Sequence, residues 1–337
     1  MKATIQDVAR KAGVSKTLVS MYLSGYRPPE QFSEESRRRM DEAVRILDYR
    51  PSAVARGLRK GRSWLIGLMI GNIANHFSAF LAQSLLNEAI ANGYQLLIVP
   101  TRFNREEEAQ CLRTLQDRQV DGIIYHLWIY SGNIRRTKCP VLQTLSADDS
   151  LESFGFDVAE ALDRAVEKVR MLGKHSICLI ANEVNSECRL ISDWKGECRK
   201  AADKRALAFE SLGYTYGMGD CWLKTLCERR PEVIFASSRL RVSEIMEYIE
   251  EHKIQYRPAF VYSYSLPSDF IRNELVIGVI RLPFKTWTKE CMKLMIEMVE
   301  NAEYVKQHSR IRADFLEPED LYRYYMEQKQ DKFYQTT

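Results

Sequence analysis

The sequence lacks the motifs that mark the commonest phosphate-binding and hydrolytic sites. Its 337 residues hold no GxGxxG or GxxxxGKS/T loop to cradle a phosphate and no GxSxG turn to present a nucleophilic serine. No uninterrupted apolar run approaches the roughly 20 residues that a membrane-spanning helix needs. The first residues read as a folded basic segment rather than as a secretion signal. We therefore expect a cytoplasmic protein with no membrane association, and catalysis is disfavoured.

Cysteine is present, but in no pattern typical of a metal centre or a disulfide framework. The chain has no CxxC pair and no Cys/His cluster with the spacing of a zinc site. Its eight cysteines stand apart, at positions 111, 139, 178, 188, 198, 221, 227 and 291. We expect free thiols, several of them buried, with no metal and no other cofactor.

Acidic side chains are scarce at the N-terminal end of the chain. Residues 1–62 carry 14 Lys or Arg against 7 Asp or Glu, a net charge of +7. Since the whole chain is at +4, the remainder carries −3. A basic module on a slightly acidic body fits phosphate binding, with an affinity that falls steeply as salt rises.

Residues 4–25 read as two short helices joined by a glycine turn. Thr4 can cap a first helix whose apolar positions have the spacing of one buried face: Ile5, Val8, Ala9 and Ala12. Gly13 suits the left-handed conformation that ends a helix. Ser15 can cap a second helix with an inner face of Leu18, Val19, Tyr22 and Leu23. The pattern favours a DNA-reading helix-turn-helix over an ordinary helical hairpin.

A third helix and a short, conditional fourth one are expected next. Ser33 can cap a helix over residues 32–47, with an apolar stripe of Met40, Ala43, Val44 and Leu47. Pro51 is well placed to begin a helix of about two turns, but Gly57 makes that helix marginal in water. We expect it to form only against a partner.

From residue 63 onward, apolar runs alternate with helical segments. We expect strands at 64–70, 95–99, 120–125, 141–145, 176–181, 233–236, 259–263 and 276–280. Helices are expected at 77–92, 105–116, 158–172, 196–212, 241–252 and 284–302. Strands separated by helices imply parallel sheets with right-handed crossovers, and there is enough chain for two such subdomains.

Several segments carry a resemblance that spans nearly the whole chain: TIQDVARKAGVSKTLVS, YRPSAVARGLRKGRS and IGLMI, with weaker matches at QVDGIIY, MLGKHSICLI and GVIRLPF. In these the sequence resembles the LacI/GalR family of bacterial repressors. The resemblance is highly specific over residues 4–67 and loose beyond about residue 180. It implies a small all-α helix-turn-helix DNA-binding head followed by an α/β periplasmic-binding-protein-like body of two parallel-sheet subdomains.

The resemblance also implies domain boundaries. The head would take residues 1–50, the hinge helix 51–62, the effector-binding and dimerisation domain 63–328, and a tail 329–337. Subdomain 1 would comprise residues 63–157 and 282–312, and subdomain 2 residues 158–281 and 313–328. A cleft for an effector would lie between the subdomains, which the chain would cross near residues 157, 281 and 312.

For the head, the resemblance implies a set of DNA-contacting residues. Lys16 and Thr17 stand where the family reads major-groove bases, and Leu58 where its paired hinge helices insert a leucine into the minor groove. Met21 replaces an arginine common in the family, so we expect a thymine methyl contact instead of a bidentate contact to guanine. The full set is Thr4, Ser15, Lys16, Thr17, Ser20, Met21, Ser24, Ser36, Tyr49, Ser52, Ala55, Arg56 and Leu58.

The resemblance is weakest where an effector would bind. Sugar-binding members of the family use carboxylates, an arginine and asparagines, and the corresponding strand ends here carry mainly serine and tyrosine. Either Arg189 or Asp193 stands at the family's arginine position. The candidate effector residues are Gly71, His76, His126, Thr144, Arg189, Asp193, Trp222, Ser237, Ser238, Tyr264 and Phe284. We expect a non-standard small-molecule effector, or none.

The expected function is that of a sequence-specific DNA-binding transcriptional regulator. The simplest form is a repressor that binds a near-palindromic operator as a dimer and responds to a small molecule in the cleft. One alternative is a regulator with a degenerate cleft, controlled by a partner protein, and another is an activator. An enzyme and an exported sugar receptor are disfavoured by the missing motifs and by the basic head.

The expected partners are a double-stranded DNA operator, a small-molecule effector and a second copy of the chain. The C-terminal stretch DLYRYYMEQKQDKFYQTT has no sustained leucine heptads, so a homodimer is expected rather than a tetramer. The protein would be associated with the nucleoid when bound to its operator.

Overall fold

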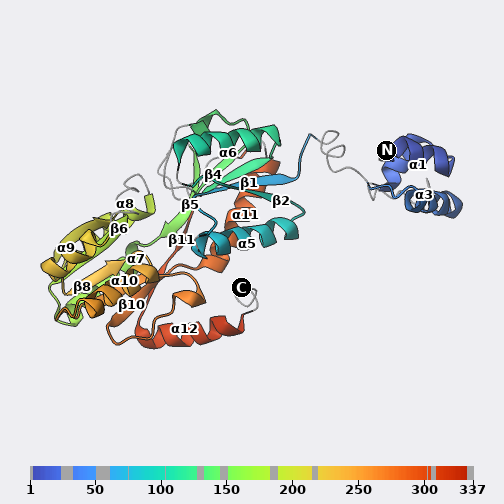
Figure 1. Ribbon diagram of the computed structural model, residues 1–337. Coiled ribbons are helices and arrows are strands. Elements are labelled where there is room, and N and C mark those ends of the chain that lie inside the picture. Colours follow the sequence, from blue (N-terminus) through green and yellow to red (C-terminus); the bar gives the residue numbers. More distant parts are fainter. Residues whose placement is uncertain are drawn as a thin grey trace. The chain divides into compact units, whose positions relative to one another are not determined.

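The computed structural model consists of two compact units, Met1–Trp64 and Leu65–Thr337, here called the head and the body (Figure 1). The structure describes residues 3–23, 33–50, 61–74, 76–102, 104–126, 133–144, 151–182, 189–214, 219–301, 303–304 and 309–331.

The described part of the head is a cluster of three short helices around one small core. The helices are α1 (Ile5–Ala12), α2 (Lys16–Leu23) and α3 (Glu34–Ile46). Among these helices, α2 and α3 each pack mainly against α1. The fully buried side chains are Val8, Ala9, Ala12, Val19, Met40 and Ala43. Because so small a core buries little apolar surface, the head also depends on its helix caps and hydrogen bonds.

The helix starts in the head carry the side-chain caps that the sequence predicts. The Thr4 hydroxyl accepts the Asp7 N–H at 3.3 Å, and the Asp7 carboxylate accepts the Thr4 N–H at 2.9 Å, which together form a capping box. Gly13 ends α1 in the left-handed region, with φ 64°. The Ser15 hydroxyl then accepts the Leu18 N–H at 3.1 Å. The predicted pair of helices with a glycine turn is confirmed.

The first sheet of the body, here sheet 1, has six strands that all pair in parallel, in the order β11-β5-β4-β3-β1-β2. The strands are β1 (Leu65–Ile70), β2 (Gln95–Pro100), β3 (Gly122–His126), β4 (Val141–Gln143), β5 (Glu152–Asp157) and β11 (Ser309–Arg312). One face is covered by α5 (His76–Ala91) and α11 (Phe284–Glu300), and the other by α6 (Arg105–Asp117) (Figure 1). A short 3-10 helix, η1 (Asn133–Arg136), lies beside α6.

Sheet 2 has the strand order β12-β10-β9-β8-β6-β7, with only β12 antiparallel to its neighbour. Its strands are β6 (Ser176–Asn182), β7 (Ala208–Tyr214), β8 (Val233–Ala236), β9 (Ala259–Tyr264), β10 (Val276–Arg281) and β12 (Asp314–Leu316). One face is packed by α7 (Ala159–Met171) and α8 (Arg189–Asp203). The other is packed by α9 (Cys221–Arg229), α10 (Arg239–Glu251) and α12 (Pro318–Gln330). The 3-10 helix η3 (Pro267–Asp269) lies beside α12.

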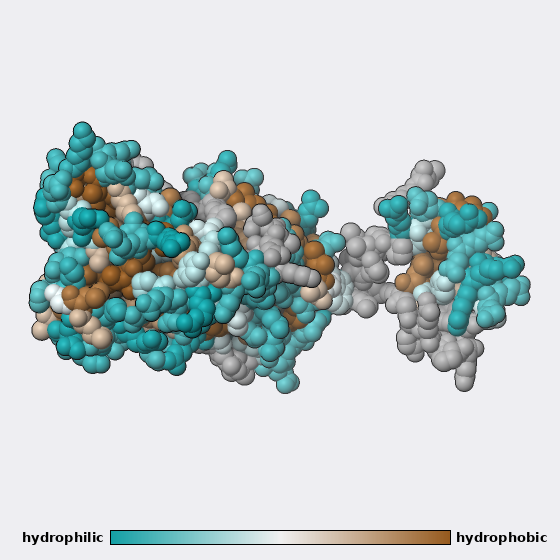
Figure 2. Space-filling view, turned by 90° about the horizontal axis from the view of Figure 1, so that it is seen from below, coloured by the Kyte–Doolittle hydropathy of each residue, from teal (hydrophilic) through white to brown (hydrophobic). Residues whose placement is uncertain are grey.

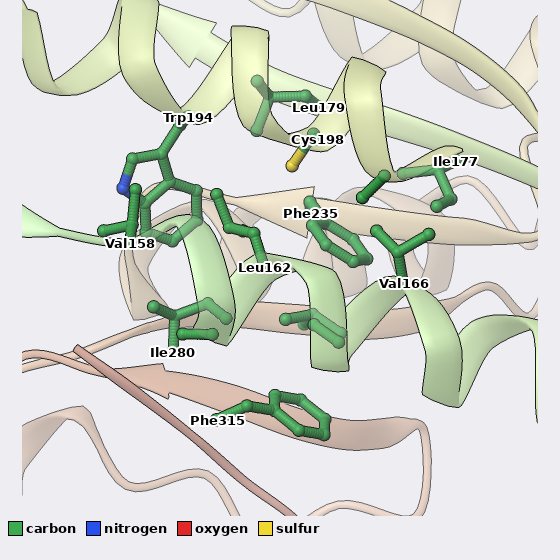
Figure 3. Packing of buried hydrophobic residues seen from close by; sticks show 14 of the residues in the cluster. Val158, Leu162, Val166, Ile177, Leu179, Trp194, Cys198, Phe235, Ile280 and Phe315 are labelled. Atoms are coloured by element: carbon green, nitrogen blue, oxygen red, sulfur yellow. The ribbon is translucent and has the colours of Figure 1, made fainter. Parts of the chain in front are cut away.

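The core between sheet 2 and α7 and α8 is built from residues far apart in the sequence. Figure 3 shows side chains from both helices meeting those of the strands: Val158, Leu162, Val166, Ile177, Leu179, Trp194, Cys198, Phe235, Ile280 and Phe315. Each of these is at most 5% exposed. This core anchors the two crossing strands β10 and β12 to the first helix that follows β5.

The chain passes between the two sheets at three places. It leaves sheet 1 after β5 and enters α7, returns after β10 into α11, and crosses a last time between β11 and β12. Strands β1 to β5 are parallel to one another, and so are β6 to β10. The carboxyl ends of both sets therefore lie at the edges from which the chain crosses to the other half. In α/β proteins this edge is where ligands bind.

The predicted fold class, an all-α head and an α/β body of two parallel-sheet subdomains, is confirmed, but one predicted helix is wrong in extent. The helix expected over residues 196–212 begins earlier and ends at Asp203. Ala206 turns the chain with φ 54°, and Ala208–Tyr214 pairs along β6 as β7. Local helix propensity across ADKRALAF is overridden by the pairing that completes sheet 2. β5, β11, β12, α9 and α12 have no counterpart among the expected elements.

The seven described cysteines are free, and Cys178, Cys198, Cys227 and Cys291 are buried, which confirms the expectation of unpaired thiols for these residues. Burial raises the pKa of Cys178 to about 12, so that thiol stays protonated and unreactive at neutral pH.

The described surface is largely hydrophilic on the face that Figure 2 presents. None of the described helices combines the length and the apolar character needed to cross a membrane. Large apolar side chains that are exposed are few: Ile46, Ile73, Ile90, Met171, Leu172, Leu240, Tyr322 and Met326.

We expect Gly278→Ala to destabilise the body. A Cβ at Gly278 would overlap the ring of Phe315 and lie 2.9 Å from the Leu316 carbonyl oxygen, so β12 would have to move away from β10. Overpacking of this kind costs about 1–3 kcal/mol. Thermal unfolding followed by circular dichroism measures the loss as a lower melting temperature.

Gly155→Ala is the matched control for this strand glycine. Nothing lies within 4 Å of a Cβ built at Gly155 in β5, so its melting temperature should stay near that of the wild type. Equal melting temperatures for both variants would contradict the close contact between β10 and β12.

Candidate DNA interface and inter-sheet site

The start of α2 presents polar side chains to solvent. Lys16 and Thr17 are exposed, whereas Ser20 and Met21 are half-buried. Ser15 precedes them and is used as the cap of the helix. A capped helix with exposed side chains in its first turn is the element that a helix-turn-helix places in the major groove.

Met21 is less outward than the sequence predicts. Its side chain packs against the small core of the head, beside Leu18 and Tyr22. The reason is the size of the core: three short helices leave a wide face of α2 to be covered, and a long flexible thioether covers it well. Part of the Met21 side chain remains accessible.

Three other predicted DNA-contacting residues have structural roles in the head. The Thr4 hydroxyl also donates to the Asp7 carboxylate at 2.7 Å, and the hydrogen bonds from Thr4 lower the pKa of Asp7. The Ser36 hydroxyl oxygen accepts from the Ser33 hydroxyl at 2.9 Å, and the half-buried Tyr49 packs against the core. Ser24, Ser52, Ala55, Arg56 and Leu58 lie outside the described residues.

The described helices of the head also carry exposed cations. Lys11 and Lys16 are exposed on α1 and α2, and Arg38 and Arg39 on α3. Arginine and lysine at the surface of a small helical module supply the phosphate contacts that fix its position on a duplex.

His126 and Thr144 are brought together at the carboxyl edge of sheet 1. The His126 Nδ1 lies 2.7 Å from the Thr144 Oγ1, and each residue is 8% exposed. Burial lowers the pKa of His126 to about 3, so the imidazole is neutral at physiological pH. The pair offers a ligand a neutral hydrogen-bonding group. Gly71, at the end of β1, is also buried, and its carbonyl accepts the Arg102 N–H at 2.7 Å.

An aromatic cluster lies against His126 and includes the predicted Phe284. The rings of Phe77 and Trp287 are centred 6.0 and 6.3 Å from the imidazole. Phe284 is 1% exposed, with its ring 5.3 Å from that of Phe77 and 6.0 Å from that of Trp287. Phe284 therefore packs in the core between α11 and α5. Trp287 was not among the predicted residues, because the rings that it meets outside its own helix lie on two separate strands, β3 and β5.

The predicted residues of sheet 2 are more dispersed. Tyr264 is fully buried, and its hydroxyl donates to Gln328 of α12 at 2.8 Å. Trp222 is 7% exposed, packs 5.6 Å from the Tyr214 ring, and lies under the Arg241 guanidinium at 6.0 Å. These contacts occupy the Tyr264 hydroxyl and the Trp222 ring, which the sequence placed in an effector site.

Ser237 and Ser238 directly follow β8 and are half-buried. Ser238 is the N-cap residue of α10, without a side-chain cap hydrogen bond. His76 and Arg189 begin α5 and α8, and their side chains lie outside the described residues.

Asp193 is held by a cation from the other half of the body. Its carboxylate on α8 lies 3.0 Å from the Arg310 guanidinium on β11 of sheet 1. A second ion pair joins the halves between Lys285 of α11 and Asp331 after α12, at 2.7 Å. The third is between Arg312 of β11 and Glu160 of α7. No local signal could have revealed these pairs, because Lys285 and Asp331 are 46 residues apart and the two β11 arginines are more than a hundred residues from their partners.

The comparisons with known proteins agree on one family. Residues 4–52 match the model for bacterial regulatory proteins of the lacI family. The catabolite control protein A of Streptococcus mutans is 32% identical over 223 residues, which cover 64% of this chain and 63% of that protein. The HTH-type transcriptional regulator PtxS of Pseudomonas aeruginosa is 31% identical over 189 residues, which cover 55% of each chain. The aligned region thus spans between about half and two thirds of these relatives.

Solved structures show the same fold at low sequence identity. A lac repressor dimer bound to operator and the anti-inducer ONPF matches with a TM-score of 0.77 at 18% identity, covering 94% of this chain and 98% of that one. A periplasmic binding protein/LacI transcriptional regulator from Alkaliphilus metalliredigens, complexed with D-xylulofuranose, matches with a TM-score of 0.64 at 18% identity. That match covers 75% of this chain and 97% of the other.

We expect His126 to make the body less stable as pH falls below 6.5. The unfolded imidazole takes up a proton near its ordinary pKa of 6.5, while the folded one stays neutral down to about 3. The unfolded state therefore binds more protons in this window, and stability falls by at most about 1.4 kcal/mol per pH unit. His126→Asn removes the titration and keeps a group that can hydrogen-bond to Thr144. Its melting temperature should fall less than that of the wild type between about pH 7.5 and pH 5.

His175→Asn is the control for this measurement. His175 is exposed, so the same substitution there removes an imidazole without altering the packing around His126. The two variants together show whether the dependence on pH belongs to the buried imidazole. A His126→Asn variant with the wild-type slope would show that the imidazole is accessible to protons in the folded body.

Proposed function

Because the chain belongs to the lacI family of bacterial regulatory proteins, we propose that it is a sequence-specific DNA-binding regulator of transcription, acting as a repressor on a near-palindromic operator in the cytoplasm. The observation that carries the proposal is the capped α2 of a basic head, with Lys16 and Thr17 exposed in its first turn. The relatives named above are regulators of transcription, which also argues against an enzyme.

The head would act by placing α2 in the major groove. Lys16 and Thr17 would meet base edges, and the accessible part of Met21 would touch a thymine methyl. The exposed cations of α1 and α3 would contact phosphates and fix the orientation of the head. Ser52, Ala55, Arg56 and Leu58 would belong to a hinge helix that forms on DNA and inserts Leu58 into the minor groove.

The body would hold two heads in register by forming a dimer through α5 and β2. Helix α5 (HFSAFLAQSLLNEAIA) has apolar residues on several sides of its axis. This pattern is typical of helices that are packed against protein on more than one side. Ile90, on its outer side, is 61% exposed. β2 is an edge strand of sheet 1, with half-buried Leu96, Leu97 and Ile98. A second copy of the chain would cover both features and avoid an exposed apolar edge.

The response to an effector would be a movement of the two halves about their crossings. The candidate effector contacts in this proposal are His126 and Thr144 of sheet 1 and Ser237 and Ser238 of sheet 2. A small uncharged molecule with hydrogen-bonding groups would suit their chemistry. It would act by shifting the balance between two arrangements of the halves.

A second candidate is a regulator with no effector, controlled instead by a partner protein. Three side chains favour it: Phe284 and Tyr264 are packed in the core, and Asp193 is paired with Arg310. In this version the ion pairs between the halves would keep the body in one arrangement.

Selection from a pool of random duplexes tests the proposed function. The full-length protein should enrich one near-palindromic sequence. Lys16→Ala should change or relax that preference, because a good bidentate contact from one side chain contributes about 1–3 kcal/mol of discrimination.

Gln6→Ala on α1 is the control, since Gln6 is exposed and has no assigned DNA contact. An equal loss of affinity for selected and random duplexes in Lys16→Ala would remove Lys16 from the reading set. No enrichment by the wild type would refute the proposed function.

Ile90→Glu tests the proposed dimer face. A charge at this position would be buried in the dimer without a partner, so we expect mostly monomer by analytical ultracentrifugation, and weaker operator binding. Met171→Glu changes a 71% exposed residue of α7, outside the proposed interface, and should remain dimeric. An unchanged dimer in Ile90→Glu would place the interface elsewhere.

A further inference from the structure

A hydrogen bond joins α2, the proposed reading helix of the head, to α3. The Tyr22 hydroxyl, in the last turn of α2, donates to the Asp41 Oδ1 in the middle of α3 at 2.6 Å. The ring of Tyr22 packs at the margin of the small core. Hydrogen bonds from a hydroxyl group to a carboxylate are shorter and stronger than hydrogen bonds between two neutral groups.

The packing of the head makes this bond important for the orientation of α2. Helix α2 packs mainly against α1, and α3 also packs mainly against α1. The one α2 residue that is fully buried is Val19. The other core contacts of α2 come from side chains that are only partly buried: Leu18, Met21, Tyr22 and Leu23. Apolar packing of this kind has little directionality, so a hydrogen bond of fixed geometry to α3 adds a constraint on rotation about the axis of α2.

Tyr22 lies on the side of α2 opposite to the exposed residues of its first turn. At about 100° per residue, position 22 lies about 120° from Lys16 and about 140° from Thr17, on opposite sides. It therefore lies nearly opposite the midpoint of the two exposed side chains. A contact that holds Tyr22 in place therefore also fixes the direction in which Lys16 and Thr17 point.

A small rotation would be enough to lose base contacts. Side chains reach about 5–6 Å from the helix axis, so a rotation of about 20° moves their ends by about 2 Å. Hydrogen bonds between nitrogen and oxygen occupy a distance range of only about 0.5 Å. Phosphate attraction, in contrast, acts over several ångströms and tolerates such a shift.

We propose that Tyr22 and Asp41 are positioning residues for DNA reading: their hydrogen bond sets the rotation of α2 and thereby the preference for operator over random DNA. They contact no base in this scheme and act through Lys16 and Thr17. The inference rests on the proposed function and adds a specificity determinant to it.

The test compares affinities of the full-length protein for its selected operator and for a random duplex, by fluorescence anisotropy. Tyr22→Phe keeps the ring and removes the hydroxyl, and Asp41→Ala removes the acceptor. Each variant should lower the ratio of operator affinity to random-duplex affinity about tenfold. In Tyr22→Phe, the affinity for the operator should fall more than the affinity for the random duplex. The double variant should show a ratio close to that of the single variants, because both substitutions remove the same hydrogen bond.

Two further variants separate the hydrogen bond from charge and from folding. Asp41→Asn keeps an acceptor oxygen and removes the charge, so it should retain most of the wild-type ratio. Glu42→Ala removes the neighbouring exposed carboxylate of α3 and should leave the ratio unchanged. Circular dichroism checks that each variant keeps the helix content of the wild type. Asp41→Ala leaves the Tyr22 ring, which packs against the core, unchanged.

The outcomes that overturn the inference differ from those that overturn the proposed function. A wild type without any sequence preference refutes the proposed function, and this inference with it. A wild-type preference that Tyr22→Phe and Asp41→Ala both retain refutes the inference alone. Equal losses on operator and random DNA, or an Asp41→Asn ratio as low as that of Asp41→Ala, also refute it.

Discussion

The three passages of the chain between its two sheets are the constraint on which the architecture of the body depends. The chain crosses at the carboxyl ends of β5 and β10, so the carboxyl ends of the strands parallel to them also face the neighbouring half. His126, Thr144 and Ser237 lie at these ends because each closes or directly follows one of the parallel strands. The same passages place Arg310 beside Asp193 and Lys285 beside Asp331, so that ion pairs join elements that the crossings bring together.

The head and the body achieve stability by different physical means. The body has several large cores, and its strands are buried on both faces, as parallel sheets require. The head has one core of six fully buried side chains, and it relies on the capping box at Thr4, the cap at Ser15 and the hydrogen bond from Tyr22 to Asp41. With so small a core, the orientation of the head's helices depends in large part on these polar contacts.

The structure of the described part of the head agrees closely with what the sequence predicts, whereas the structure at the candidate effector residues does not. The caps, the glycine turn and the helix starts depend on contacts within a few residues, so they were predictable at Thr4, Gly13 and Ser15. The strand β7 was mistaken for helix because its conformation is decided by pairing with β6. Phe284, Tyr264 and Trp222 stand at ends of helices and strands, yet their contacts depend on α5, α12 and Arg241, which pack from elsewhere in the chain.

By itself the sequence determined the basic helix-turn-helix and the alternation of strands and helices, because these follow from local spacing, capping and charge, and its motifs carried the family resemblance. Only the tertiary structure decided which predicted side chains are available to a ligand and which are used to hold the protein together. Hydrogen bonds and ion pairs join residues from about 20 to over 100 positions apart, as Tyr22 with Asp41 and Arg310 with Asp193 show. Such contacts leave no periodic trace in the chain, since each depends on where two separate elements come to lie.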